Sequence, residues 1–168
     1  MPVRRAYDRL DMSAAVLSTD VDRLLPYRAE QLFDIAADIE RYPQFLRWWI
    51  ASKVHEHRGD YCRVENTVVL GPMRLHFWSE AHLQRPQRIE VTSQDEPFRR
   101  FTLSWNFEPR SSGCRVELCA QLELRSRLMQ ELIEPTLNRI ASEVIGAFEA
   151  RASELCCQKP PEPLRRPD

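Results

Sequence analysis

The sequence contains only four glycines in 168 residues, so a glycine-rich loop that cradles phosphate groups is hardly possible. It also lacks any stretch long and apolar enough to span a bilayer. Neither sign of charge dominates, because 24 basic side chains stand against 25 acidic ones. Bulk electrostatics therefore do not drive binding to nucleic acid, and we expect no DNA partner.

The first residues also lack the features of a targeting segment. Arg4 and Arg5 are not followed by an apolar run, which argues against a secretory signal. Asp8 and Asp11 argue against a mitochondrial transit peptide, since such peptides are poor in acidic residues. We therefore expect a cytoplasmic protein, whose five cysteines stay reduced.

A period of two dominates the middle of the chain. Apolar and polar residues alternate over 73–83, 88–91, 101–107 and 116–124, and more weakly over 61–70. Such alternation is typical of antiparallel strands with one buried and one solvated face. A further strand is expected over 19–25, and Gly71-Pro72 and residues 111–113 mark turns.

Helical spacing appears in two places. Residues 29–37 predict a short helix, and Pro43 is expected to end a second one that follows Asp38. Residues 127–156 predict one long amphipathic helix, bent or started afresh at Pro135. This helix must cover the concave face of the sheet but cannot fill it. The remaining space is either plugged by large side chains or left as a cavity for an apolar ligand.

Several short motifs carry a family resemblance: YPQFLRW at 42–48, EPFRRF at 96–101, WNF at 105–107, GCRV at 113–116 and AFEARA at 147–152. In this order they resemble the coenzyme Q-binding START-domain proteins, whose bacterial relatives include those named ribosome association toxin RatA. The resemblance covers roughly residues 18–155. Arg47 and Trp49 depart from the family pattern, which usually has proline before the tryptophan and often cysteine after it.

The resemblance implies an α+β fold of the helix-grip (START-like) type. In this fold a curved antiparallel sheet of about seven strands wraps around a long C-terminal helix, and two short helices follow the first strand. The domain is expected to span residues 18–157, between a flexible leader (1–17) and a disordered tail (158–168). The resemblance also implies a hydrophobic tunnel that binds quinone or lipid, and no catalytic residue.

The candidate ligand contacts are apolar and aromatic side chains expected near this tunnel, with one amide among them: Tyr42, Phe45, Leu46, Trp48, Val64, Asn66, Phe77, Phe101, Trp105, Met129, Leu132, Ile133 and Leu137. The cluster around Trp48 either gates the tunnel or packs a short helix. Asn66 shares the inner face with Val64, where its amide either meets a quinone carbonyl or bonds to the protein. Adjacent residues of an extended segment face opposite ways, so Trp48 or Trp49 should be exposed.

Other chemistries lack the necessary residues. His55 and His57 share a face, but no cysteine or carboxylate pattern completes a four-ligand zinc site around them. We find no pairing of a nucleophile with a base. The sequence thus predicts no catalytic residue, no metal site and no required cofactor, and ubiquinone would be a bound ligand.

Three functions remain open. The leading hypothesis is a carrier or chaperone that binds ubiquinone or another isoprenoid lipid, supports respiratory electron transport, and docks transiently on the inner membrane through Arg47, Trp48 and Trp49. The second, suggested by the family naming, is a toxin-like regulator of translation that binds a ribosomal subunit through Arg99 and Arg100. The third is a polyketide aromatase/cyclase, which would need acid–base groups inside the cavity.

Overall fold

The computed structural model describes residues 16–157. The tail expected over 158–168 lies outside the described residues, as does the leader expected over 1–17 except for its last two residues. Leu17, the last residue of the expected leader, is the first residue of a strand. The first strand is thus two residues longer at its start than the alternation from Thr19 predicted.

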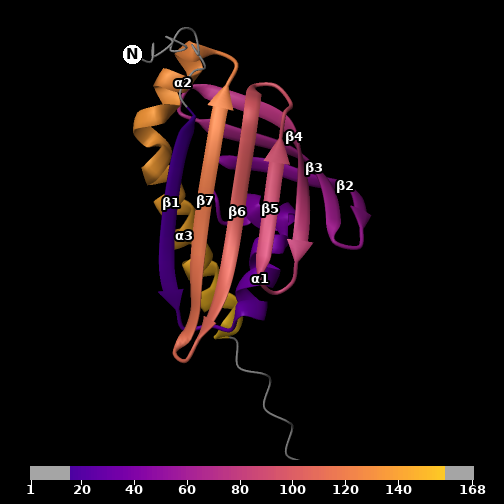
Figure 1. Ribbon diagram of the computed structural model, residues 1–168, viewed down its shortest axis with the longest axis vertical. Helices are drawn as coiled ribbons and strands as arrows, with labels where there is room; N and C mark the ends of the chain where they lie inside the picture. The colour runs from indigo at the N-terminus through magenta and orange to yellow at the C-terminus, as the bar shows by residue number, and fades with distance from the viewer. Residues whose placement is uncertain (1–15, 158–168) are drawn as a thin grey trace, which may run out of the picture.

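Within the described residues, seven strands form one antiparallel sheet in the order β1-β7-β6-β5-β4-β3-β2 (Figure 1). Consecutive strands from β2 to β7 pair as a meander, and β1 pairs with β7. The sheet and its alternating faces are as predicted. The strands are β1 (Leu17–Leu25), β2 (Trp49–Arg58), β3 (Tyr61–Leu70), β4 (Met73–Gln84), β5 (Arg88–Ser93), β6 (Phe98–Arg110) and β7 (Gly113–Leu124).

Gly113 opens β7 with a φ of 144°, in a region that side chains rarely adopt. A Cβ atom at this position would lie 2.0 Å from the carbonyl oxygen of Leu25. Glycine therefore lets the turn between β6 and β7 pass against the end of β1.

Two short helices connect β1 to β2: α1 (Ala29–Ala37) and the 3₁₀ helix η1 (Ile39–Gln44). The bounds of α1 match the prediction. The expectation that Pro43 ends the following helix is wrong, because Pro43 lies inside η1. Pro43 has no N–H to donate, and the hydrogen bonds of this turn come from residues after it. The N–H groups of Phe45 and Leu46 both donate to the carbonyl oxygen of Tyr42.

The C-terminal helix is divided where Pro135 stands, as the sequence predicted. It consists of α2 (Arg127–Ile133), the 3₁₀ turn η2 (Glu134–Thr136) and α3 (Leu137–Cys156). The Ser126 hydroxyl caps α2 by accepting the N–H of Met129 at 3.3 Å. The helix lies behind the sheet in Figure 1, with α2 at one end and α1 near the other.

The core between sheet and helices consists of two clusters. The first, here called the two-helix end, lies where α1 and α3 both pack on the sheet and includes Phe33, Trp105, Phe107, Ile145 and Phe148. The second, the single-helix end, is covered by α2 and the start of α3 and includes Phe77, Phe98, Leu124, Ile133 and Leu137.

Candidate ligand cavity

An apolar cavity of about 110 Å³ lies between the sheet and the C-terminal helix, where the two clusters meet. All strands of the sheet except β5 supply most of its walls, and Ile133 at the end of α2 and the first turns of α3 lie over it. Its lining residues are Thr19, Tyr42, Trp48, Trp49, Val68, Leu70, Leu75, Phe77, Phe98, Phe101, Leu103, Trp105, Leu118, Ala120, Leu122, Ile133, Leu137, Ile140, Ala141 and Val144.

The structure brings seven of the predicted contact residues to this cavity: Tyr42, Trp48, Phe77, Phe101, Trp105, Ile133 and Leu137. The others do not line it: Phe45, Leu46, Val64, Asn66, Met129 and Leu132. Leu46 and Val64 are buried in the two-helix end instead. Phe45 packs edge-on against Phe148, with ring centroids 5.1 Å apart.

Asn66 is buried as expected, but its amide is occupied by the protein. The Ser52 hydroxyl donates to Asn66 Oδ1 at 2.9 Å, and Asn66 Nδ2 donates to Ser79 Oγ at 2.9 Å. The indole N–H of Trp49 in turn donates to Ser52 Oγ. Asn66 therefore helps to hold Trp49 in place through Ser52. Trp49 lines the cavity, whereas Asn66 does not.

The two tryptophans are both half-buried, so the prediction that one of them is exposed is wrong. Trp48 precedes β2, and the pairing of β2 with β3 shifts register between Trp49 and Ala51. The two side chains are thus not forced to opposite faces of a regular strand. Their ring centroids lie 5.4 Å apart, and both rings line the cavity.

Thr19, which sequence reasoning passed over as a contact, also lines the cavity. It is 6% exposed, and its hydroxyl oxygen has no hydrogen-bond partner. Its place between Leu17 and Val21 on the inner face of β1 was the available signal. The other hydroxyl in the wall belongs to Tyr42 and donates to the carbonyl oxygen of Ala36. Burial raises the pKa of Tyr42 far above its ordinary value.

A cleft of about 250 Å³ adjoins the cavity, between the β3–β4 turn and the helix break at Pro135. The cleft and the cavity share Trp48, Leu70, Ile133 and Ile140. Leu132 lines the cleft and is 50% exposed, and Leu128, one turn earlier on α2, is 68% exposed. We call this cleft the mouth of the cavity.

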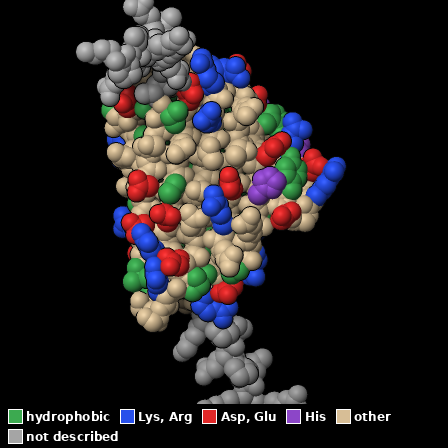
Figure 2. All heavy atoms as spheres, viewed as in Figure 1, with side chains coloured by type: hydrophobic (Ala, Val, Ile, Leu, Met, Phe, Trp, Pro, Cys, Tyr) green, Lys and Arg blue, Asp and Glu red, His purple; other side chains and the backbone are tan. Residues whose placement is uncertain are grey.

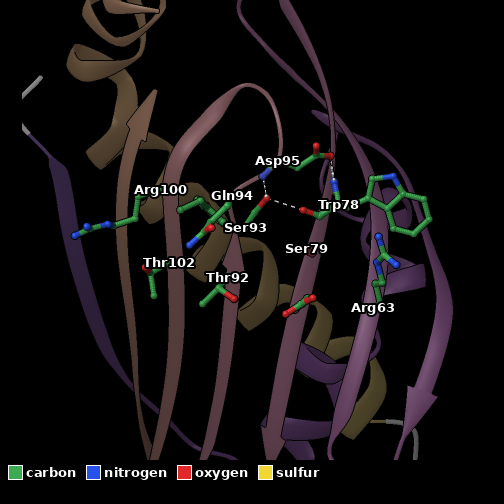
Figure 3. Close-up of a pocket in the computed structure, with 11 residues that line it drawn as sticks. Arg63, Trp78, Ser79, Thr92, Ser93, Gln94, Asp95, Arg100 and Thr102 are labelled. Carbon is green, nitrogen blue, oxygen red and sulfur yellow. Dashed lines mark hydrogen bonds between the residues drawn. The ribbon is translucent and has the colours of Figure 1, made fainter. Parts of the chain in front are cut away.

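A larger and more polar hollow, of about 680 Å³, lies where β4 and β5 part beyond the pair Glu80–Thr92 (Figure 3). Beyond that pair, side chains form hydrogen bonds to the backbone of β4 in place of the backbone pairing between β4 and β5. Asp95 accepts the N–H of Trp78 at 2.9 Å, and Ser93 donates to the Trp78 carbonyl at 2.6 Å. Its polar walls make it unsuited to an apolar ligand, in spite of its greater size.

Within residues 16–157, no group of three or more His, Cys, Asp or Glu side chains could hold a metal ion. His55 and His76 instead both bond to the carboxylate of Glu65, at 2.7 and 2.8 Å. In the same part of the chain, no helix is both long and apolar enough to cross a membrane.

A family model described as polyketide cyclase/dehydrase and lipid transport matches residues 25–149. The chain therefore belongs to this family, and its seven-stranded sheet with a long C-terminal helix is the START-like, helix-grip fold. A START superfamily protein from Mycobacterium smegmatis has the same fold, with a TM-score of 0.66 at 17% identity over 83% of this chain and 98% of that one.

Two curated relatives carry different functional names. The ribosome association toxin RatA of Pseudomonas aeruginosa is 32% identical over 142 residues, which cover 83% of this chain and 99% of the toxin. The mitochondrial coenzyme Q-binding protein COQ10 homolog B of Xenopus laevis is 26% identical over 138 residues, which cover 79% of this chain and 57% of that protein. The resemblance drawn from the sequence motifs is confirmed.

Proposed function

We propose that this protein binds an isoprenoid lipid with a ring headgroup, a polyprenyl quinone above all, and carries or chaperones it at a membrane. The observation that carries the proposal is the apolar cavity that adjoins a cleft at the helix break. The relative named for coenzyme Q binding supports the choice of ligand.

The size of the cavity favours partial burial of the ligand. An apolar cavity of roughly 150 Å³ holds a benzene-sized ring, so about 110 Å³ suits a small ring and not a polyprenyl chain. The tail would then leave through the mouth, past Leu132. Entry of a substituted quinone ring requires the walls to move, and the helix break at Pro135 is the place for such movement.

Binding without catalysis fits the lining of the cavity. Tyr42 is the one titratable side chain among the lining residues, its hydroxyl is already bonded, and its raised pKa keeps it protonated. General acid–base catalysis near neutral pH needs a group that titrates there. A polyketide cyclase reaction at this cavity is therefore less well supported.

The membrane contact that we propose is α2, in place of the half-buried Trp48 and Trp49. Leu128 and Leu132 are exposed beside the mouth, where a lipid would leave a bilayer and enter the cavity. Two leucines on a seven-residue helix give only weak, reversible attachment, which suits exchange of a ligand.

Ribosome binding remains the second candidate because of the relatives named RatA. Figure 2 shows basic and acidic side chains interspersed on the outer face of the sheet, without a field of one sign. Arg99 forms an ion pair with Glu123, with Nη1 of Arg99 3.5 Å from Oε1 of Glu123. Arg100 lines the polar hollow on this face, where RNA phosphate would be within its reach.

The test begins with organic extraction of the purified protein and mass spectrometry of the extract, which should contain a quinone or a related isoprenoid. Ligand uptake from quinone-loaded vesicles should then fall strongly in the variant Leu128→Asp/Leu132→Asp. The matched control is Leu24→Asp/Leu155→Asp, which alters two exposed leucines away from the mouth. Equal uptake by both variants would contradict docking through α2. Co-sedimentation with ribosomal subunits that Arg100→Ala abolishes, without any ligand uptake, would favour the second candidate.

A further inference from the structure

The polar hollow extends through the sheet toward the apolar cavity. Its outer part is formed by a row of cross-strand neighbours: Arg63, Glu80, Thr92 and Thr102. The pairing of β4 with β5 ends at Glu80–Thr92, and the next residue of each strand, Ser79 and Ser93, is buried and lines the hollow (Figure 3). The hollow therefore reaches from the outer face of the sheet to the level of its inner face.

One half-buried side chain, Phe101, lines both the hollow and the cavity. Its ring centroid lies 5.0 Å from that of Phe98 and 6.1 Å from that of Phe77, and both of these rings line the cavity as well. Where β4 and β5 part, the cavity is thus closed by packed aromatic rings and not by a backbone ladder. A side chain can change its rotamer without breaking strand hydrogen bonds, so this part of the wall can open.

The oxygens of a quinone ring need polar partners that the cavity does not offer. The cavity wall that residues 16–157 build exposes only apolar surface. A ring oxygen held inside it would lose its hydrogen bonds to water and gain none from the protein. Polar groups lie just beyond Phe101, in the hollow, where the exposed Gln94 carries an amide and the half-buried Thr102 carries a hydroxyl.

We propose that the ring of the bound lipid displaces the Phe101 side chain, so that its outer oxygen reaches the polar hollow and is bonded there by Gln94 and Thr102. This inference rests on the proposed function. The amide donates to a quinone carbonyl, and the hydroxyl either donates to it or accepts from the hydroxyl of a reduced ring. Among residues 16–157, the hollow and the mouth share no lining residue, so the ring and the tail occupy separate openings. The ring is then within reach of water-soluble reactants while the tail stays bound.

The test compares polar side chains at the two openings. Gln94→Met and Thr102→Val remove the bonding groups of the hollow and keep the side-chain size, and Arg139→Met is the matched change at the mouth. The probes are a short-chain ubiquinone and squalene, an isoprenoid hydrocarbon without oxygen, each competed against one fluorescent apolar dye. Each hollow variant should weaken quinone binding roughly fivefold, the value of one neutral hydrogen bond, and leave squalene binding unchanged. Arg139→Met should change neither.

Infrared spectroscopy of the bound quinone separates recognition from a structural role. A hydrogen bond lowers the stretching frequency of a carbonyl group, so one carbonyl band should be lowered in the wild type and return to its unbonded position in the double variant Gln94→Met/Thr102→Val. Unlowered carbonyl bands in the wild type, or a lowered band that only Arg139→Met restores, would overturn the assignment of the hollow and leave lipid binding intact. If the wild-type protein bound neither probe, the proposed function itself would fall.

Discussion

The two ends of the core are built on the same sheet but differ in what covers them. At the two-helix end, α1 and α3 pack on each other and on the sheet, and Phe148 contacts three aromatic rings. At the single-helix end, the interrupted helix of α2, η2 and the start of α3 is the one helical cover among residues 16–157. The cavity borders the second end. A space for a ligand therefore arises from an incomplete helical layer and not from a special sheet.

The sharpest way to test this contrast is to truncate one side chain at each end. Phe148→Ala should lower the free energy of unfolding by about 3–5 kcal/mol, because its buried ring contacts Tyr42, Phe45 and Trp105. Leu132→Ala should cost less than about 1 kcal/mol, since half of that side chain is already exposed. Urea denaturation of both variants measures the difference, and equal losses would erase the distinction between the two ends.

Enlarging a small residue should have different consequences at the cavity wall, which includes Ala141, and away from it at Ala152. Ala141→Leu adds three carbon atoms to the cavity wall and should change stability by less than about 1 kcal/mol while it reduces quinone binding at least roughly tenfold. Ala152→Leu places the same atoms at a fully buried site of the two-helix end and should destabilise the protein by about 1–3 kcal/mol. Thermal unfolding and quinone titration of both variants provide the comparison. If Ala141→Leu binds quinone normally, the cavity is not the site.

The helix on either side of Pro135 should differ in local stability. Amide hydrogen exchange should be faster in α2 than in the buried turns of α3 around Ile145 and Ala152, because α2 exposes two of its leucines. Bound quinone should slow exchange in α2 more than in α3. Uniform protection along residues 127–156, with and without ligand, would argue against α2 as a movable cover.

The smallest expected effect concerns the attachment of α1 to the sheet. Arg85 holds both carboxylate oxygens of Asp34, at 2.8 and 2.9 Å, and its guanidinium lowers the pKa of that carboxyl. A lowered pKa means that the contribution is present at neutral pH and is lost as pH falls below about 4. Because both groups are half exposed, Asp34→Asn should cost less than about 1 kcal/mol at pH 7. The wild type and the variant should converge in stability at pH 3.

The sequence predicted elements better than it predicted the site. Alternation placed β3 to β7 correctly, and Pro135 marked the helix break. The edge strand β2 had no individual prediction, since its burial alternates poorly and a bulge interrupts it. Alternation also predicts which face of the sheet a side chain lies on, but not whether that part of the strand borders the cavity. Val64 and Asn66 therefore face inward as expected and still miss the cavity, whereas Thr19 lines it.

The pairing of β1 with β7 sets the order in which this protein can be assembled. Leu17 of β1 pairs with Leu122 of β7, so β1 can pair only after β7 has been synthesised. Local hairpins from β2 to β6 can form during synthesis, but Thr19 and Ile140 face the same space only after α3 has been made. The cavity is consequently absent from the nascent chain until α3 has been made and has packed on the sheet.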